Sequence, residues 1–370
     1  MTHASTSPLT NNNTQDSNAA STVKGYQAPL SIDLAERGWL PDALLRWGMR
    51  RICAERLQEE QADNPGAFDL LQREYIQQWR EGPLAIATDD ANEQHYELPP
   101  AFFEKVLGKH LKYSCAFWPD AVQTLDHAEA AMLTLTCARA ELADGMDILE
   151  LGCGWGSLSL WMAREYPRSS ITAISNSAPQ RQWIEAQAAE RGLTNLKIIT
   201  ADINDFDIEQ KFDRVVSIEM FEHLRNHAEL FRRIRAWLKD DGRLFTHVFC
   251  HRELAYPYEA KSDNDWMAQY FFTGGIMPSY DLFLNYQSDL ELVNRWWLGG
   301  EHYEKTSNAW LAKQDAHRDE LVQLFEQHYP PAEAARWFNR WRMFFMAVAE
   351  LFGYEQGRQW GVGHYLFKAR

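Results

Sequence analysis

The chain has 370 residues, of which 37 are Lys or Arg and 52 are Asp or Glu, so its formal net charge is −15. Proteins that bind nucleic acid draw most of their affinity from Lys and Arg on phosphates, and this charge therefore argues against such a partner. The apolar fraction of 45% is ordinary, but 15 Trp residues are unusually many. They indicate either a large aromatic core or a pocket walled by rings.

The cysteines and the apolar segments indicate a protein of a reducing cytoplasm. The five cysteines lack CxxC spacing, which disfavours a disulfide framework and a zinc site. Residues 1–25 lack the apolar core of a signal peptide, and no stretch approaches the roughly 20 apolar residues of a membrane span. We expect a small-molecule partner, no metal and no stable membrane insertion. A homodimer is compatible with the sequence.

The N-terminal part of the chain is predicted to be helical after a flexible polar tail over residues 1–28. Between Ile32 and Leu107, apolar residues recur mostly at spacings of three and four, which is the period of one helix face. The turn Asn64-Pro65-Gly66 interrupts this pattern. We assign residues 29–125 to an N-terminal helical region.

After Gly145, short apolar runs alternate with helical stretches. The expected strands are Asp147–Leu151, Ser170–Ser175, Leu196–Thr200, Arg214–Ile218 and Arg243–Phe249. The expected helices between them are Ser157–Tyr166, Pro179–Arg191 and Ala228–Leu238. This alternation predicts an α/β domain over residues 126–370 with a mostly parallel sheet and helical crossovers.

The alternation stops near residue 251. We expect the aromatic-rich segment from about 251 to 355 to be a helical insertion over the sheet, and Trp360–Lys368 to form a closing edge strand. The aromatic residues assigned to this cap are Trp266, Tyr270, Phe271, Phe272, Trp296, Trp297, Trp341, Phe344 and Phe345. For most of them a place in the core is the better expectation.

A glycine loop follows the first expected strand and opens a helix. It reads Glu150-Leu151-Gly152-Cys153-Gly154-Trp155-Gly156, at the place where a doubly wound fold brings backbone against a ligand. A dinucleotide is the alternative ligand, but Gly156 comes one residue too early for that fingerprint. Between Glu165 and Glu185 there is also no acid to hold a ribose. The loop therefore favours S-adenosylmethionine over a nicotinamide cofactor.

Several further motifs occur together with this loop. In chain order they are Tyr113-Ser114-Cys115, Ser175-Asn176-Ser177 with Gln180, Ala201-Asp202-Ile203 and Phe221-Glu222-His223. In this combination the chain resembles the cyclopropane fatty acid synthase superfamily of methyltransferases, and most closely its coclaurine N-methyltransferase-like group. The resemblance implies a Rossmann-like class I methyltransferase fold with N-terminal helices and a helical substrate cap.

The resemblance also implies which residues bind S-adenosylmethionine. They are Tyr113, Ser114, Gly152, Gly154, Ser175, Asn176, Gln180, Asp202, Ile203 and Ile218. The first pair would close over the methionine moiety, and the two glycines would line its bed. Ser175, Asn176 and Gln180 would hold the ribose, and Asp202 with Ile203 would contact adenine. All but the first pair fall at or just beyond expected strand ends, where ligands of such folds bind.

Glu219, Glu222 and His223 follow the fourth expected strand. If this segment is helical, spacings of three and four place the side chains on one side. Methyl transfer to an amine needs a free lone pair, although aliphatic amines are protonated near neutral pH. We assign Glu219 to binding the substrate ammonium, and Glu222 with His223 to removing its proton. Alternatively, one of these carboxylates only caps a helix.

A lipid substrate is the main alternative. The resemblance implies that fatty-acyl cyclopropane synthases hold a carbonate ion as base, through groups that match Cys115, Glu222, His247 and Tyr303 here. All four are present, so a bound bicarbonate is the additional cofactor that this alternative predicts. Against it, the lipid enzymes carry glycine at the position of Glu219 and Gly-Asn at that of Pro99-Pro100.

Methylation of a small thiol is a further alternative, in which Glu219 would have no ammonium to hold. For the amine interpretation, the resemblance places Trp341 and Phe344 in the wall of the substrate pocket. Their rings would support cation–π contact with the acceptor.

Overall fold

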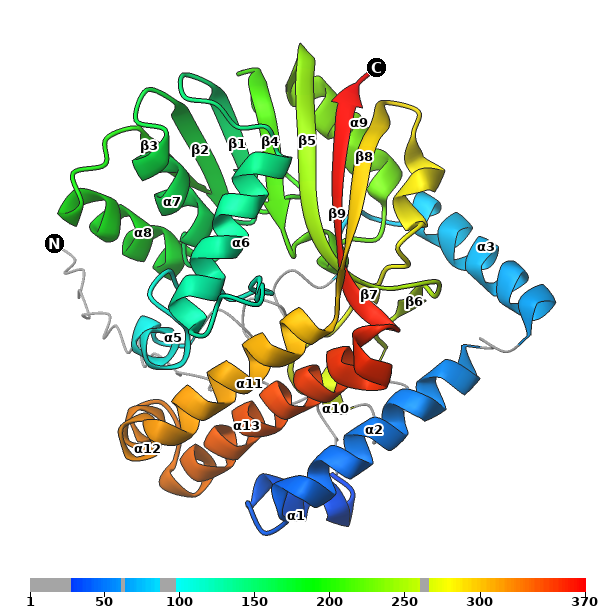
Figure 1. Cartoon of the computed structure of the whole chain (residues 1–370), viewed down its shortest axis with the longest axis vertical. Coiled ribbons are helices and arrows are strands. Elements are labelled where there is room, and N and C mark those ends of the chain that lie inside the picture. Colours follow the sequence, from blue (N-terminus) through cyan, green and yellow to red (C-terminus); the bar gives the residue numbers. More distant parts are fainter. Residues whose placement is uncertain (1–27, 61–63, 87–97, 260–265) are drawn as a thin grey trace, which may run out of the picture.

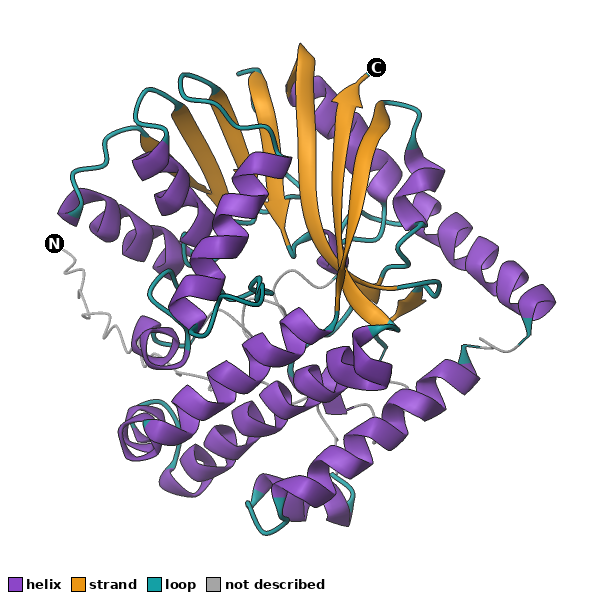
Figure 2. Cartoon of the chain, viewed as in Figure 1, coloured by secondary structure: helices purple, strands orange, loops and turns teal. Residues whose placement is uncertain are grey.

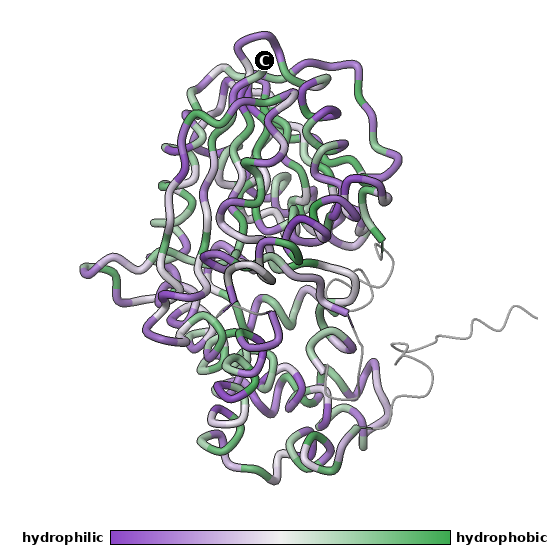
Figure 3. Tube along the Cα trace, turned by 90° about the vertical axis from the view of Figure 1, so that its right-hand side faces the viewer, coloured by the Kyte–Doolittle hydropathy of each residue, from purple (hydrophilic) through white to green (hydrophobic). Residues whose placement is uncertain are grey.

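The computed structural model describes residues 28–60, 64–86, 98–259 and 266–370 (Figure 1). It has a sheet flanked by helices and a second, helical layer beyond one end of that sheet (Figure 2). Seen from the side, the two layers are stacked one above the other (Figure 3). Residues 1–27, which include nearly all of the predicted polar tail, lie outside the described residues.

The central sheet has seven strands in the order β3-β2-β1-β4-β5-β9-β8. The strands are β1 (Asp147–Leu151), β2 (Ser170–Ser175), β3 (Leu196–Thr200), β4 (Phe212–Ile218), β5 (Leu238–His251), β8 (Leu290–Gly299) and β9 (Trp360–Ala369). The first five are mutually parallel, and β9 is antiparallel to both β5 and β8. The predicted α/β class with a mostly parallel sheet is confirmed.

Helices cover both faces of this sheet because successive strand residues point to opposite sides. Ile148 packs with apolar residues of α6 and α7, whereas the next residue, Leu149, packs with those of α9. The flanking helices are α6 (Leu125–Arg139), α7 (Ser157–Glu165), α8 (Ala178–Glu190), α9 (His227–Trp237) and α3 (Pro65–Glu81). The three predicted crossover helices are thus present within one residue at each end.

The second layer joins the N-terminal helices to the C-terminal ones. Its helices are α1 (Leu30–Glu36), α2 (Asp42–Glu59), α5 (Pro100–Val106), α10 (Trp266–Tyr270), α11 (Glu301–Ala316), α12 (Arg318–Glu326) and α13 (Pro331–Gly353). Glu36 of α1 is buried and pairs with Arg340 of α13 at 2.9 Å. Glu350 of α13 likewise pairs with Arg46 and Arg50 of α2. The N-terminal helices therefore form part of the cap.

The segment assigned to the helical insertion also contains strands. β6 (Tyr256–Pro257) pairs with β7 (Ile276–Met277), and β8 is the edge of the central sheet. The prediction of Trp360–Lys368 as an edge strand is therefore wrong, because β8 covers its outer side. In the sequence analysis Trp296 and Trp297 were assigned to the helical cap, but both residues lie on β8. Short 3₁₀ turns at Phe221–His223, Leu282–Tyr286 and Tyr354–Gly357 complete the described elements.

Candidate active site

The glycine loop joins β1 to α7 in a shape that requires glycine. Gly152 and Gly154 have φ values of +75° and +50°, in the left-handed region that side chains disfavour. A Cβ on Gly152 would lie 2.8 Å from Cγ of Met220. A Cβ on Gly154 would have no atom within 4 Å, because this residue faces the open space of a pocket. The loop thus leaves room for a ligand beside Gly154.

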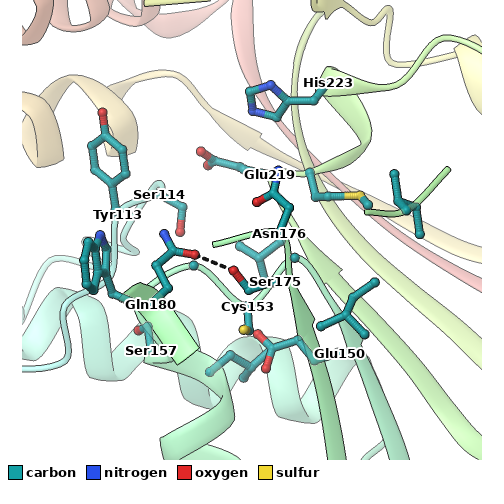
Figure 4. A pocket seen from close by; sticks show the side chains of 18 of the residues that line it. Tyr113, Ser114, Glu150, Cys153, Ser157, Ser175, Asn176, Gln180, Glu219 and His223 are labelled. Carbon is teal, nitrogen blue, oxygen red and sulfur yellow. Dashed lines mark hydrogen bonds between the residues drawn. The ribbon is translucent and has the colours of Figure 1, made fainter. Parts of the chain in front are cut away.

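All ten residues predicted to bind the cofactor line this one pocket, which lies at the carboxyl ends of β1, β2, β3 and β4 (Figure 4). They are Tyr113, Ser114, Gly152, Gly154, Ser175, Asn176, Gln180, Asp202, Ile203 and Ile218. We call it the cofactor pocket. The parallel strands bring these residues together from distant parts of the chain, as the general rule for open α/β sheets predicts.

Buried polar atoms in the cofactor pocket have unused hydrogen-bonding capacity. The Ser175 hydroxyl donates to Oε1 of Gln180 at 2.7 Å and accepts from the Ser177 amide at 3.0 Å. Gln180 Nε2, Trp155 Nε1 and the Ser157 hydroxyl are buried without a hydrogen-bond partner among the described residues. Since such groups are normally paired, they fit a polar ligand such as S-adenosylmethionine.

Two charged residues of the cofactor pocket were not predicted from the sequence. Lys112 is buried and donates to the Ser114 hydroxyl, and Glu150 is buried and accepts from the Ser159 hydroxyl. Burial raises the pKa of Glu150 to about 7 and lowers that of Lys112. Glu150 is the first residue of the glycine-loop motif, but in the sequence analysis it was assigned no role in binding. No periodicity in the sequence signals the burial of Lys112.

Glu219 directly follows β4 and lies at the centre of the site. Its φ of 47° is in the left-handed region, which is rare for a residue with a side chain. Its carboxylate accepts from the Cys115 amide at 2.9 Å and from the Tyr303 hydroxyl at 2.7 Å. His247 Nε2 lies 3.0 Å from Oε1 of the same carboxylate. Burial raises the pKa of Glu219, while nearby Lys112 and the hydrogen bonds from Cys115 and Tyr303 oppose the rise.

The structure separates the other two members of the predicted cluster. Phe221–His223 is a 3₁₀ turn and not the regular helix that would align all three side chains. His223 lines the cofactor pocket and contacts the Phe272 ring, and burial lowers its pKa to about 4. Glu222 is fully buried, accepts from the Phe249 amide at 2.6 Å and does not line this pocket. Burial raises the pKa of Glu222 well above its usual value.

A second, larger pocket lies between the sheet and the cap, with a volume of about 570 Å³. Its walls are mostly aliphatic and aromatic, with Phe272, Phe344 and Phe352 among them. Tyr113, Glu219 and His223 line both this pocket and the cofactor pocket. In Figure 4 these three side chains lie across the cofactor pocket from Glu150 and Ser157. The two pockets therefore meet at a carboxylate, an imidazole and a phenol.

The structure brings only some of the predicted substrate-pocket residues to this surface. Tyr303 and Phe344 line the larger pocket, whereas Cys115 and His247 are buried and reach Glu219 from behind. Trp341 is 1% exposed and does not line the pocket. It packs against Phe102, Phe103, Phe271 and Phe345 instead. The interpretation of Trp341 as a pocket wall is not supported, because its neighbours in the cap enclose the ring.

The described residues contain no group of three or more His, Cys, Asp or Glu side chains placed to hold a metal ion. No helix among them is long and apolar enough to cross a membrane.

The doubly wound sheet, the glycine loop and the pocket at the strand ends define a class I S-adenosylmethionine-dependent methyltransferase. The model of the mycolic acid cyclopropane synthetase family matches residues 86–358, and the chain belongs to this family. It is therefore an enzyme that transfers a methyl group from S-adenosylmethionine to a small-molecule acceptor.

Individual relatives point to one branch of the family. The chain is 38% identical to an (S)-coclaurine N-methyltransferase of Thalictrum flavum subsp. glaucum over 295 residues, which cover 79% of this chain and 82% of that protein. It is 34% identical to an (S)-coclaurine N-methyltransferase of Papaver somniferum over 340 residues, covering 90% and 96%. The predicted resemblance is confirmed.

A solved structure agrees with these relatives. The crystal structure of coclaurine N-methyltransferase bound to N-methylheliamine and SAH has a TM-score of 0.85 and 35% identity to this chain. The alignment covers 91% of this chain and 98% of that one. The N-terminal helices and the cap are therefore part of the shared architecture.

Proposed function

We propose that the enzyme methylates the nitrogen of a bulky, hydrophobic amine that binds in the larger pocket. The observation that carries this proposal is the junction of the two pockets at Tyr113, Glu219 and His223. A mostly apolar pocket with the Glu219 carboxylate where it meets the cofactor pocket suits a hydrophobic molecule with a cationic group. The N-methyltransferases among the relatives support an amine as the acceptor.

We assign the ten predicted residues of the cofactor pocket to binding S-adenosylmethionine. When bound, this group supplies an electrophilic methyl on its sulfonium. The relative solved with SAH supports this cofactor. The unpaired nitrogen of Gln180 and the open space at Gly154 are the features of this chain that would receive it.

Glu219 and His223 divide the work on the acceptor in this proposal. The Glu219 carboxylate binds the substrate ammonium and places its nitrogen at the junction. His223 accepts the proton that must leave before the lone pair can attack. Its lowered pKa keeps the ring unprotonated near neutral pH but also makes it a weaker base, so its contribution to the rate is smaller than that of an unperturbed histidine. Glu222 lies behind this surface, and its raised pKa suits a neutral carboxylic acid that supports the turn. Alignment of the nitrogen contributes more than the base, because positioning supplies about 7–11 kcal/mol in favourable cases.

We further propose that Glu219 takes the place of the carbonate ion that the resemblance to the lipid enzymes suggested. Three of the four groups expected to hold that ion, from Cys115, His247 and Tyr303, are within hydrogen-bond distance of the Glu219 carboxylate. The ion and this side chain would compete for the same partners. Bicarbonate is therefore not required for turnover in this enzyme.

A methyl-transfer screen tests this function. The enzyme is incubated with S-adenosylmethionine and hydrophobic cyclic amines, small thiols or monounsaturated phospholipid vesicles, in buffer with and without bicarbonate. We expect transfer to amines at a rate that bicarbonate does not change. Preferred transfer to thiols or lipids would refute the amine proposal, and strong activation by bicarbonate would refute the role of Glu219 as its replacement.

We propose that the enzyme is located in the cytoplasm. The five cysteines are all free and buried, which supports a reducing cytoplasm. A homodimer remains a prediction from the sequence, and sedimentation of the purified enzyme would test it.

A further inference from the structure

Behind Glu219, three side chains form a continuous series of hydrogen bonds that leads away from the pockets. Arg139 Nη1 lies 2.8 Å from His364 Nδ1, and His364 Nε2 lies 2.9 Å from His247 Nδ1. His247 Nε2 then lies 3.0 Å from the Glu219 carboxylate. His247 on β5 and His364 on β9 are direct partners in the antiparallel register, so the sheet itself holds the two rings together.

The direction of the series follows from its first member. An arginine side chain has only donors, so His364 Nδ1 must accept its hydrogen bond. A neutral His364 then carries its proton on Nε2 and donates to His247 Nδ1. A neutral His247 in turn carries its proton on Nε2 and donates to Glu219. Both rings are fully buried, and burial together with nearby cations lowers both pKa values well below 6.5, so both are neutral.

Arg139 is suited to this role by its surroundings. It is half-buried at the end of α6 and lies over the Trp296 ring of β8 at 4.9 Å. No carboxylate of the described residues forms an ion pair with it. Its guanidinium is therefore held in place by a ring and a histidine, and its charge is not neutralised by an acid.

We infer that Arg139 and His364 are positioning residues that fix the tautomer of His247 and so keep the Glu219 carboxylate ionised and oriented toward the acceptor. This inference rests on the proposed role of Glu219 in binding the substrate ammonium. With both tautomers reversed, the lone pair of His247 Nε2 would face the carboxylate oxygen. The carboxylate would then have to bind a proton or rotate away, and in either case it would hold the ammonium less well.

The first test needs no substrate. ¹⁵N NMR of histidine-labelled wild-type enzyme distinguishes the two neutral tautomers, and the relevant signals are assigned by their loss in His247→Gln and His364→Gln. We expect His247 and His364 both to be protonated on Nε2 and to stay neutral through the pH range of activity. A proton on Nδ1 of His247 would overturn the inference, whatever the acceptor proves to be.

The second test uses matched variants. Arg139→Met removes the donor, and Arg139→Lys keeps one. Arg164→Met is the control, because Arg164 also lies over a tryptophan ring, at 4.5 Å from Trp161, but has no hydrogen bond to a histidine in the described structure. Arg139→Met should lose the tautomer pattern and raise KM for the amine about tenfold, the effect of one weakened charge-assisted contact. Its affinity for S-adenosylmethionine should not change.

The controls make the outcome decisive. Arg139→Lys should restore most of the amine affinity, and Arg164→Met should resemble the wild type in both measurements. Unchanged tautomers and unchanged KM in a folded Arg139→Met would refute the inference. If Arg139→Met does not fold, the same measurements are made on His364→Leu and His364→Gln. Of these two, only the glutamine side chain can donate a hydrogen bond to His247, so only His364→Gln should keep the amine affinity. Failure of the amine screen would leave the NMR result standing, so the two proposals fail separately.

Discussion

Glu219 is held in a backbone conformation that costs a non-glycine residue about 1–2 kcal/mol. Glycine adopts it without this cost, and the resemblance gives glycine to the lipid enzymes at this position. A chain that keeps glutamate there must gain from the carboxylate. The three hydrogen-bonding groups around that carboxylate show what holds it in place.

Glu219→Gln should reduce the affinity for the amine by about 1.5–3 kcal/mol, the range for a hydrogen bond to a charged group. The change removes the charge and keeps the shape, so affinity for S-adenosylmethionine should change little in calorimetry. Glu219→Gly is an informative second variant, because it removes the backbone strain at this position and empties the space beside Cys115, His247 and Tyr303. We expect added bicarbonate to restore part of its turnover. Wild-type amine affinity in Glu219→Gln would contradict the assignment.

The pH dependence should separate Glu219 from His223. The reference pKa of histidine is near 6.5, but burial lowers that of His223 to about 4, so the ring stays neutral as the pH falls from 7 to 5. Glu219 behaves oppositely, because its raised pKa brings protonation and loss of charge closer to neutral pH. The acidic limb of kcat/KM should therefore disappear in Glu219→Gln. His223→Ala should lower kcat without removing that limb, and a limb near pH 6.5 that His223→Ala abolishes would contradict this.

At the scale of elements, the sequence predicted the parts in which apolar periodicity is strong. The predicted parts of β1, β2, β4 and β5 are largely buried, so their apolar runs are clear, whereas in β3 only Ile198 is buried. β8 was missed because its residues are mostly half-exposed, so Leu290–Gly299 lacks a clean alternation. The pairing of His247 with His364 could also not be predicted from the sequence, since a strand pattern does not reveal which residues of two strands lie opposite each other.

Helix α13 offers a matched pair of aromatic residues that separates packing from binding. Trp341 is enclosed by other rings, while Phe344 lines the larger pocket and stacks on Phe271 at 4.5 Å. Trp341→Ala should lower the free energy of unfolding by about 3–5 kcal/mol, as large buried aromatic side chains do. Phe344→Ala should raise KM for the amine and destabilise the fold less. Denaturant titration and kinetics on both variants check this, and the reverse ranking would show that the pocket extends to Trp341.

At the scale of the whole molecule, the proposed sites for the cofactor and the amine are two separate pockets, whose linings share Tyr113, Glu219 and His223 among the described residues. The cofactor pocket belongs to the sheet and its loops. Helices α1 and α2 form one wall of the larger pocket. Ion pairs such as that between Arg46 and Glu350 hold these helices against α13. A change deep in one pocket should therefore leave binding in the other intact.

Gly154→Val tests this division. Its side chain would enter the open space beside the loop and strain a left-handed backbone, so S-adenosylmethionine should no longer bind. In the wild type, this ligand at about 100 times its Kd should add about 2.7 kcal/mol of stability and raise Tm by about 3–4 °C for a chain of this length. The shift should vanish in Gly154→Val and persist in Phe344→Ala. Asp202→Ala should weaken binding by only about 1–3 kcal/mol, because it removes one hydrogen-bonding group. A full shift in folded Gly154→Val would exclude this loop from the cofactor site.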